Sequence, residues 1–281
     1  MPALTHLPPF LQGPMARAVA RASAALLLFG AWSTFMWFHP ARRWPVVGVV
    51  RGTFRELAAG WGLGDHYAWA ARVAVFTPLG ILLASLLVWR PPRAFLLHGG
   101  APPTAMRRLL GLALIVALPF QIALGAAPGM HHYYRRFFED QALSHLMANA
   151  LTIAAEHLWI EGAMLGLALP VGLLAATPVD EPRVGRLARF GLGFPERATA
   201  ASQRTVSAWL GVQPLAWPAI LAQGLLFFLI HFHKHPGELA TSLPGGIAVG
   251  WLTLRTRSFV PAMVLHFVTG GVVLLTMTLT R

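Results

Sequence analysis

The chain contains no cysteine. It can therefore form no disulfide and offer no thiolate nucleophile, which excludes cysteine-protease chemistry and leaves the redox compartment open. Charged residues are also scarce, at 11% of the 281 residues, whereas hydrophobic residues make up 56% and the mean hydropathy is +0.59. Soluble domains carry about 25% charged residues. The composition thus excludes an ordinary soluble domain and predicts an integral membrane protein.

Apolar stretches long enough to cross a bilayer recur along the chain. A crossing takes about 20 residues as a helix. We predict an all-α, polytopic transmembrane bundle of about seven helices (six to eight), near residues 22–39, 67–89, 108–128, 144–176, 215–232, 243–255 and 258–279. Pro170 and several glycines interrupt the long fourth stretch, so we expect it to tilt, to break near Gly162 or to extend into water.

No repeat or shift in composition marks a second domain. We therefore expect one integral membrane domain over residues 1–281, with variable N-terminal helices in 1–143 and the helices that carry the site in 144–279. Residues 1–21 contain Pro8, Pro9 and Pro14 and no cleavage-like ending, which favours a retained first helix over a removed signal peptide.

Positive charge exceeds negative charge, with a formal net charge of +12. The arginines are scattered among short loops rather than gathered into one stripe, so we expect no binding to nucleic acid. One set of alternate loops carries thirteen Lys and Arg residues and the other set eight. This bias predicts a cytoplasmic N-terminus and an outside C-terminus, in what we expect to be the bacterial inner (plasma) membrane. The stretch 177–214 is interpreted as a cytoplasmic loop with a short interfacial helix, or as a simple connector.

Acidic residues are rare at membrane depth. Of ten, eight fall in predicted loops or at helix ends: Glu56, Asp65, Glu139, Asp140, Asp180, Glu181, Glu196 and Glu238. Only Glu156 and Glu161 lie within a predicted span. An ionisable group there costs on the order of 3 kcal/mol or more unless it faces a partner or water. Both glutamates are therefore candidates for a functional site.

Glu156 belongs to a polar stripe on the fourth predicted helix. His145, Asn149, Thr152 and Glu156 follow one another at steps of four, three and four, which places them on one helical face. Asn149 is the only asparagine in the chain. The stripe indicates either a site around Glu156 or a seam of hydrogen bonds that holds helices together.

Two further segments place histidines within predicted spans. In FFLIHFHKHP, Phe227 and His231 are four apart and share one helical face. His231 and His235 also have the spacing of helical zinc ligands, but Pro236 ends a helix there, so a solvated turn is the preferred interpretation of His233 and His235. In SFVPAMVLHFVTGG, we expect His266 roughly 13 Å into the last span. It is either a packing residue or part of a site shared with Glu156 and His231.

The segments EHLWIEG, FFLIH and HFVTG, in this order, resemble the CPBP intramembrane proteases. This group includes the type II CAAX prenyl endopeptidase, bacteriocin-processing relatives and myxosortase-like members. Its pattern is Glu-Glu-x-x-x-Arg, then Phe-x-x-x-His, then His-x-x-x-Asn or Asp. The resemblance covers roughly residues 145–275. It implies that Glu156 is a general base, that His231 helps to hold and activate a water, and that His266 stabilises the oxyanion.

Three positions depart from that pattern. His157 replaces the second glutamate and Glu161 replaces the arginine. The two lie four residues apart, so we expect them to face each other across one helical turn as a charge-swapped pair. Gly270 replaces the Asn or Asp that, in the family that the chain resembles, would be an oxyanion partner of the histidine. Asn149 or Thr269 could supply the missing donor.

The resemblance implies an intramembrane endopeptidase that cleaves a membrane-associated or exported-protein tail with a glutamate-activated water. We expect no cofactor; zinc held by Glu156, His231 and His266 is the alternative. The expected partners are a membrane-anchored or exported protein substrate and the lipid bilayer. Other possibilities are a non-catalytic, immunity-type relative and a transporter with a proton-relay glutamate. The chain lacks the Gly-x-Ser-x segment of rhomboid-type serine proteases and the His-Glu-x-x-His motif of site-2-type metalloproteases.

Overall fold

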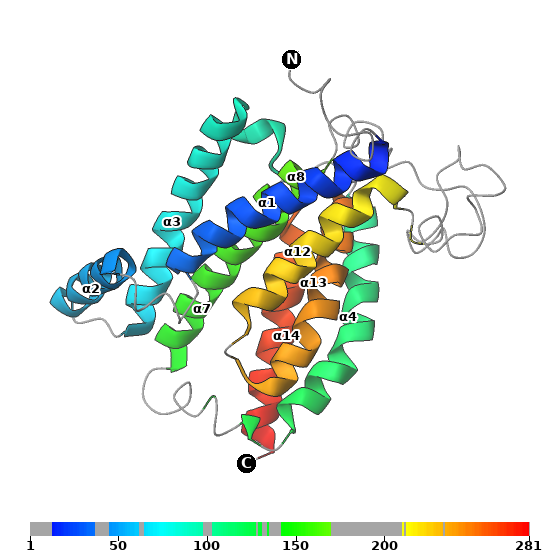
Figure 1. Cartoon of the computed structure of the whole chain (residues 1–281). Coiled ribbons are helices and arrows are strands. Elements are labelled where there is room, and N and C mark those ends of the chain that lie inside the picture. The colour runs from blue at the N-terminus through cyan, green and yellow to red at the C-terminus, as the bar shows by residue number, and fades with distance from the viewer. Residues whose placement is uncertain are drawn as a thin grey trace.

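Every element of the described chain is a helix, which confirms the predicted all-α fold. The computed structural model describes residues 13–36, 45–61, 65–97, 103–127, 129–130, 134, 142–169, 210, 212–232 and 234–280. Its elements, drawn in Figure 1, are α1 (Pro14–Met36), α2 (Pro45–Gly60), α3 (Asp65–Val88), η3 (Pro92–Ala94), α4 (Pro103–Gly125), α7 (Ala142–His157), η4 (Leu158–Met164), α8 (Leu165–Ala168), η6 (Pro214–Ala216), α12 (Trp217–Ile230), α13 (Pro236–Thr256) and α14 (Val260–Leu279).

Four of these helices are long and apolar enough to cross a membrane: Pro14–Thr34, Tyr67–Val88, Met106–Gly125 and Val260–Leu279. The segment Pro214–Ile230 is apolar but shorter. Each of the seven predicted stretches coincides with a helix, although the predicted bounds differ. The interpretation of Pro236 was wrong, because this residue begins α13 rather than ending a helix. Proline is well tolerated at the first position of a helix, where its missing N–H has no intrahelical acceptor.

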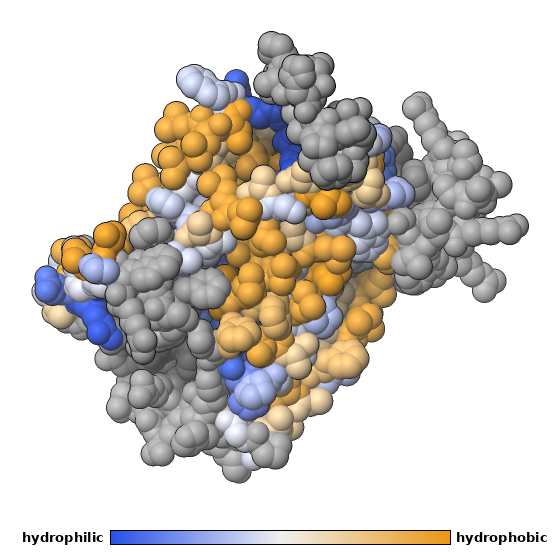
Figure 2. All heavy atoms as spheres, in the orientation of Figure 1, coloured by the Kyte–Doolittle hydropathy of each residue, from blue (hydrophilic) through white to orange (hydrophobic). Residues whose placement is uncertain are grey.

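The outer surface of the bundle is apolar. Many large hydrophobic side chains are exposed on it, among them Leu27, Leu86, Ile115 and Leu275. Figure 2 shows this apolar surface as a broad band across the middle of one face, with hydrophilic residues toward its ends. Soluble monomers rarely expose contiguous apolar patches of this kind. The chain is therefore an integral membrane protein whose helices meet lipid.

The bundle core forms where α1 packs against α12 and α8. Phe29 of α1 packs against Trp159 of η4 with the two rings tilted and their centroids 4.2 Å apart, and both side chains are fully buried. The indole N–H of Trp159 donates to the hydroxyl of Ser33 at 3.0 Å. These contacts fix the middle of the fourth predicted helix against the first.

The connection after α3 enters the core, which was not predicted from the sequence. Phe95 and Leu97 follow η3 and are buried. The Leu97 amide donates to the Gly162 carbonyl at 3.0 Å, and the Phe259 amide donates to the Leu97 carbonyl at 2.9 Å. At Gly166 a Cβ would collide with the Phe95 carbonyl, so only glycine allows this approach. The segment thus ties η4 and α8 to the start of α14.

A second unpredicted element is α2, which lies in a stretch interpreted as a connection between the first two spans. It packs against α3 and lies at the edge of the molecule in Figure 1. Arg51, Arg55 and Glu56 interrupt its apolar residues. A transmembrane stretch would lack such charges, and this is why a search for long apolar runs passes over an amphipathic helix.

Candidate functional site

The fourth predicted helix changes its winding at the site. It is α-helical from Ala142 to His157, π-helical from Leu158 to Met164, and α-helical again to Ala168. The change falls between His157 and Gly162, close to where an interruption was expected. Because a π-helix turns less per residue, it rotates the side chains that follow relative to an α-helix, and such segments are frequent at functional sites. Glu156 and His157 end the α-helical part, and Glu161 lies inside the π-helical part.

A buried hydrogen-bonded group, which we call the paired group, consists of His157, Glu161 and Gln223. His157 Nδ1 lies 2.9 Å from Glu161 Oε2, and Gln223 Nε2 of α12 donates to Glu161 Oε1 at 2.6 Å. All three side chains are fully buried. The predicted contact between His157 and Glu161 is thereby confirmed. Gln223 was not predicted, although a lone amide in an otherwise apolar span signals a hydrogen bond between helices.

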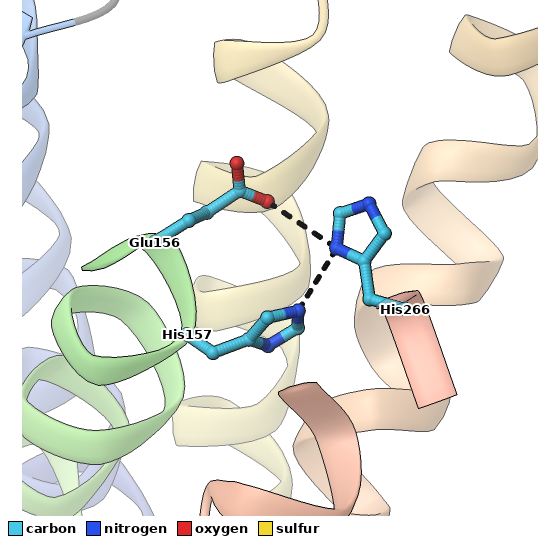
Figure 3. Close-up of side chains that lie close together, drawn as sticks. All are labelled: Glu156, His157 and His266. Atoms are coloured by element: carbon cyan, nitrogen blue, oxygen red, sulfur yellow. Dashed lines mark hydrogen bonds and ion pairs between the residues drawn. The ribbon is translucent and has the colours of Figure 1, made fainter. Parts of the chain in front are cut away.

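His266 of α14 joins this group to Glu156. Its Nδ1 lies 2.9 Å from His157 Nε2 and 3.8 Å from Glu156 Oε1. Figure 3 shows the three side chains of Glu156, His157 and His266 pointing toward one another from two segments distant in sequence. The His266 side chain is 23% exposed, whereas that of Glu156 is 5% exposed. The imidazole therefore has a buried edge that faces His157 and a second edge open to other groups.

Glu156 is buried without its hydrogen bonds being satisfied. Among the described residues its Oε1 atom has no hydrogen-bond partner, since His266 lies beyond hydrogen-bond distance. A buried carboxylate oxygen without a partner costs free energy. A water molecule, a substrate group or an ion bound at this position would supply the missing interaction.

His231 lies directly after α12 and stacks on Phe227, with ring centroids 4.5 Å apart. Its Nδ1 lies 2.7 Å from the Phe227 carbonyl oxygen. A carbonyl can only accept, so Nδ1 carries the hydrogen, and in the neutral ring Nε2 is an acceptor. The ring centroids of His231 and His266 are 6.4 Å apart. The structure therefore brings Glu156, His231 and His266 to one region, and we call these three the open group.

The other residues expected at the site differ in their placement. Thr269 is buried, and its hydroxyl donates to its own helix, at the carbonyls of Leu265 (2.9 Å) and His266 (3.1 Å). Its one proton is thus already engaged. Asn149 is partly exposed on α7, while a Cβ at Gly270 would meet nothing within 4 Å.

The described polar residues that remain from the predicted stripe and histidine tract form hydrogen bonds within their own segments. Thr152 donates to the carbonyl of Ala148 in its own helix at 2.9 Å. His231 and His235 do not share a helix, because α12 ends at Ile230 and His235 caps α13 by accepting from the Gly237 amide at 3.2 Å. The side chain of His145, the whole of His233 and most of the stretch 177–214 lie outside the described residues.

A possible metal-binding group within the described residues consists of Glu156, His157 and His266, whose ligand atoms lie within 4.8 Å of one another. The zinc alternative from the sequence named His231 in place of His157. His231 is absent from this group, and its Nδ1 is already bonded to a carbonyl. The hydrogen bond to His266 likewise occupies His157 Nε2.

The comparisons with known proteins give one match. The family model of type II CAAX prenyl endopeptidase Rce1-like proteins matches residues 198–272. The matched segment contains Phe227, His231, His266 and Gly270, while Glu156 precedes it. Neither a curated protein nor a solved structure matches the chain.

Proposed function

We propose, from the match of residues 198–272 to the family model of Rce1-like type II CAAX prenyl endopeptidases, that the chain is an intramembrane endopeptidase whose general base is Glu156. The observation that carries this proposal is the buried Glu156 oxygen without a hydrogen-bond partner, 3.8 Å from His266. In the membrane such a group persists where it serves a function, because it destabilises the resting protein.

The proposed reaction begins with a water between Glu156 and His231. Glu156 accepts a proton from this water, and the water oxygen forms a bond to the carbonyl carbon of the substrate. His231 orients the water because its Nε2 accepts a hydrogen bond once Nδ1 has donated to Phe227. The electron pair of the carbonyl moves to its oxygen. When the carbon–nitrogen bond breaks, Glu156 returns the proton to the leaving amine.

His266 has the proposed role of stabilising the oxyanion. It is the most exposed member of the open group, so it can reach a substrate carbonyl, and its buried edge is held by His157. A single donor of this kind contributes about a hundred- to a thousandfold in rate. Gly270 offers no second donor from the same helix, and the hydroxyl of Thr269 is bonded to that helix. We therefore expect a slow enzyme with strong dependence on His266.

The proposed substrate is a membrane-associated peptide, such as the C-terminal tail of an exported protein. With the N-terminus in the cytoplasm of a bacterium, the end of α12 that carries His231 faces outward. An exported tail reaches that side, whereas a cytosolic prenylated tail does not. Fusions of a periplasm-dependent reporter to Arg281 test this orientation, and activity of the reporter is the expected result.

The decisive experiment is a cleavage assay with purified protein in liposomes. The substrates are peptides with a transmembrane anchor and an exported-type tail, compared with prenylated tails. Wild type, Glu156→Gln and the matched control Ser33→Ala are assayed with and without a chelator. Ser33 is buried and bonds Phe29 and Trp159, neither of which belongs to the open group, so its loss perturbs the contact between α1 and η4.

We expect cleavage by wild type and Ser33→Ala that survives chelation, and none by Glu156→Gln. Loss of cleavage on chelation would replace the glutamate mechanism with a metal-dependent one. Equal cleavage by Glu156→Gln would reject the role of Glu156. No cleavage of any peptide by wild type would favour the non-catalytic alternative.

A further inference from the structure

Glu161, His157 and His266 form a continuous line of hydrogen bonds that the proposed reaction does not itself use. The line starts at Gln223 on α12, passes through Glu161 and His157, and ends at His266 on α14, with separations of 2.6, 2.9 and 2.9 Å. The first three side chains are fully buried, so water does not compete for these bonds. The line connects a buried carboxylate to His266, whose side chain is 23% exposed.

The donors and acceptors along this line are constrained. Gln223 Nε2 donates to one oxygen of Glu161, and His157 Nδ1 lies against the other. A carboxylate accepts both bonds, so Nδ1 of His157 carries a hydrogen. With Glu161 ionised, an imidazolium at His157 makes the buried pair neutral. A neutral ring would leave the carboxylate charge uncompensated, which costs several kcal/mol in an apolar interior.

An imidazolium at His157 donates from Nε2 to His266 Nδ1, because both of its nitrogens carry hydrogens. His266 Nδ1 is then an acceptor, and the hydrogen of the neutral His266 ring lies on Nε2. This is the tautomer that can donate to a substrate oxyanion. The opposite arrangement, with Nδ1–H on His266, would leave an acceptor at the open edge.

The helix that carries His266 offers no other support for this tautomer. Gly270, one turn further on, has no side chain, and Thr269 uses its hydroxyl proton within the helix. Glu156 Oε1 is 3.8 Å away, too far for a hydrogen bond. Among the described side chains, only that of His157 forms a hydrogen bond with the His266 ring.

We propose that Glu161 and His157 are positioning residues that hold His266 in the Nε2–H tautomer with its donor toward the substrate. This inference rests on the proposed function for its catalytic consequence, while the tautomer itself can be measured without any substrate. Glu161 acts only through His157, and His157 only through His266.

The direct test is nitrogen NMR of the purified protein in micelles with ¹⁵N-labelled histidine. The resonances of His266 are assigned with His266→Gln, and those of His157 with His157→Gln. We expect His266 to be protonated at Nε2 only and His157 at both nitrogens. In Glu161→Gln the charge that supports the imidazolium is gone, and we expect the proton of His266 to move to Nδ1.

Kinetics supply the second readout for the same variant. Glu161→Gln is nearly isosteric and should lower kcat about a hundred- to a thousandfold, as loss of an oxyanion donor does, with KM within about twofold of wild type. Ser33→Ala is the matched control, because it also removes one buried hydrogen bond to the η4 segment. It should leave the His266 tautomer and kcat unchanged.

Several outcomes would overturn the proposal. A wild-type His266 protonated at Nδ1 does so by itself, even if Glu161→Gln fails to fold. An unchanged tautomer and unchanged kcat in folded Glu161→Gln do the same, as does a bound divalent metal whose removal alters the His266 resonances. If wild type cleaves no peptide but the tautomer behaves as expected, the proposed function fails and the positioning role stands.

Discussion

The paired group and the open group differ in how their polar atoms are satisfied. In the paired group, both carboxylate oxygens of Glu161 and both ring nitrogens of His157 have partners, and only the amide oxygen of Gln223 lacks one. In the open group, Glu156 has an oxygen without a hydrogen-bond partner among the described residues, and the His266 side chain is 23% exposed. The two glutamates lie five residues apart on one helix yet have opposite surroundings.

We expect the paired group to contribute to the stability of the fold and the open group to contribute to the proposed reaction. A buried polar group with all its partners holds helices in one arrangement, whereas one without partners is poised to bind something else. The family resemblance alone would assign Glu161 a structural role and Glu156 a reactive one. The hydrogen bonds of Glu161 support this proposed assignment, which can be tested by measuring stability as well as activity.

The largest expected effect is on stability, when each glutamate is truncated. Glu161→Ala leaves His157 and Gln223 without their partner and should lower the free energy of unfolding by about 3–5 kcal/mol. Glu156→Ala removes a carboxylate whose Oε1 has no partner and should change it by less than about 1 kcal/mol. The measurement is SDS titration in mixed micelles followed by circular dichroism.

Ser33→Ala serves as the control for that comparison, since it deletes two buried hydrogen bonds, to the Phe29 carbonyl and from the Trp159 indole, and should cost about 1–3 kcal/mol. Equal losses for the two glutamate variants would remove the distinction between the groups.

A smaller effect is expected from the interaction of His157 and Glu161. In a double-mutant cycle with His157→Ala and Glu161→Ala, the second substitution should add little, because the first has already broken the pair. The coupling energy should be about 1–3 kcal/mol. The same titration measures it, and strictly additive losses would show that the 2.9 Å contact does not contribute to stability.

The smallest expected effect is a difference in stability between alanine substitutions at two glycines near the site. A Cβ at Gly250 would collide with Gln223 Oε1, whereas a Cβ at Gly270 meets nothing within 4 Å. Gly250→Ala should therefore displace Gln223 and cost about 1–3 kcal/mol. Gly270→Ala should stabilise α14 by about 0.5–1 kcal/mol, since alanine favours a helix. Thermal unfolding of both variants in micelles compares them, and a stabilising Gly250→Ala would contradict the close contact.

A large part of the fold follows from local patterns. Seven apolar stretches coincide with helices because a long apolar run has few alternatives in a membrane. The amphipathic helix α2 and the buried residues Phe95 and Leu97 were missed. Neither segment contains a long apolar run in the sequence. The burial of a short connection depends on contacts with distant segments, such as the bond of Leu97 to Gly162.

The candidate site was predicted in part. Spacing of four residues was enough to anticipate the contact of His157 with Glu161, because both lie on one helix. Gln223 was missed, and the bond of His157 to His266 was not anticipated, since both involve a second helix. The metal alternative illustrates the same limit, because the group that the structure assembles contains His157 rather than His231.

By itself the sequence determined that this chain enters a membrane as helices and which few ionisable residues lie at depth, because composition and periodicity act locally. The tertiary structure decided which of those residues meet. Whether a buried carboxylate is satisfied depends on side chains from other helices. Their packing gave Glu161 a hydrogen bond from Gln223, and left one oxygen of Glu156 without a partner among the described residues.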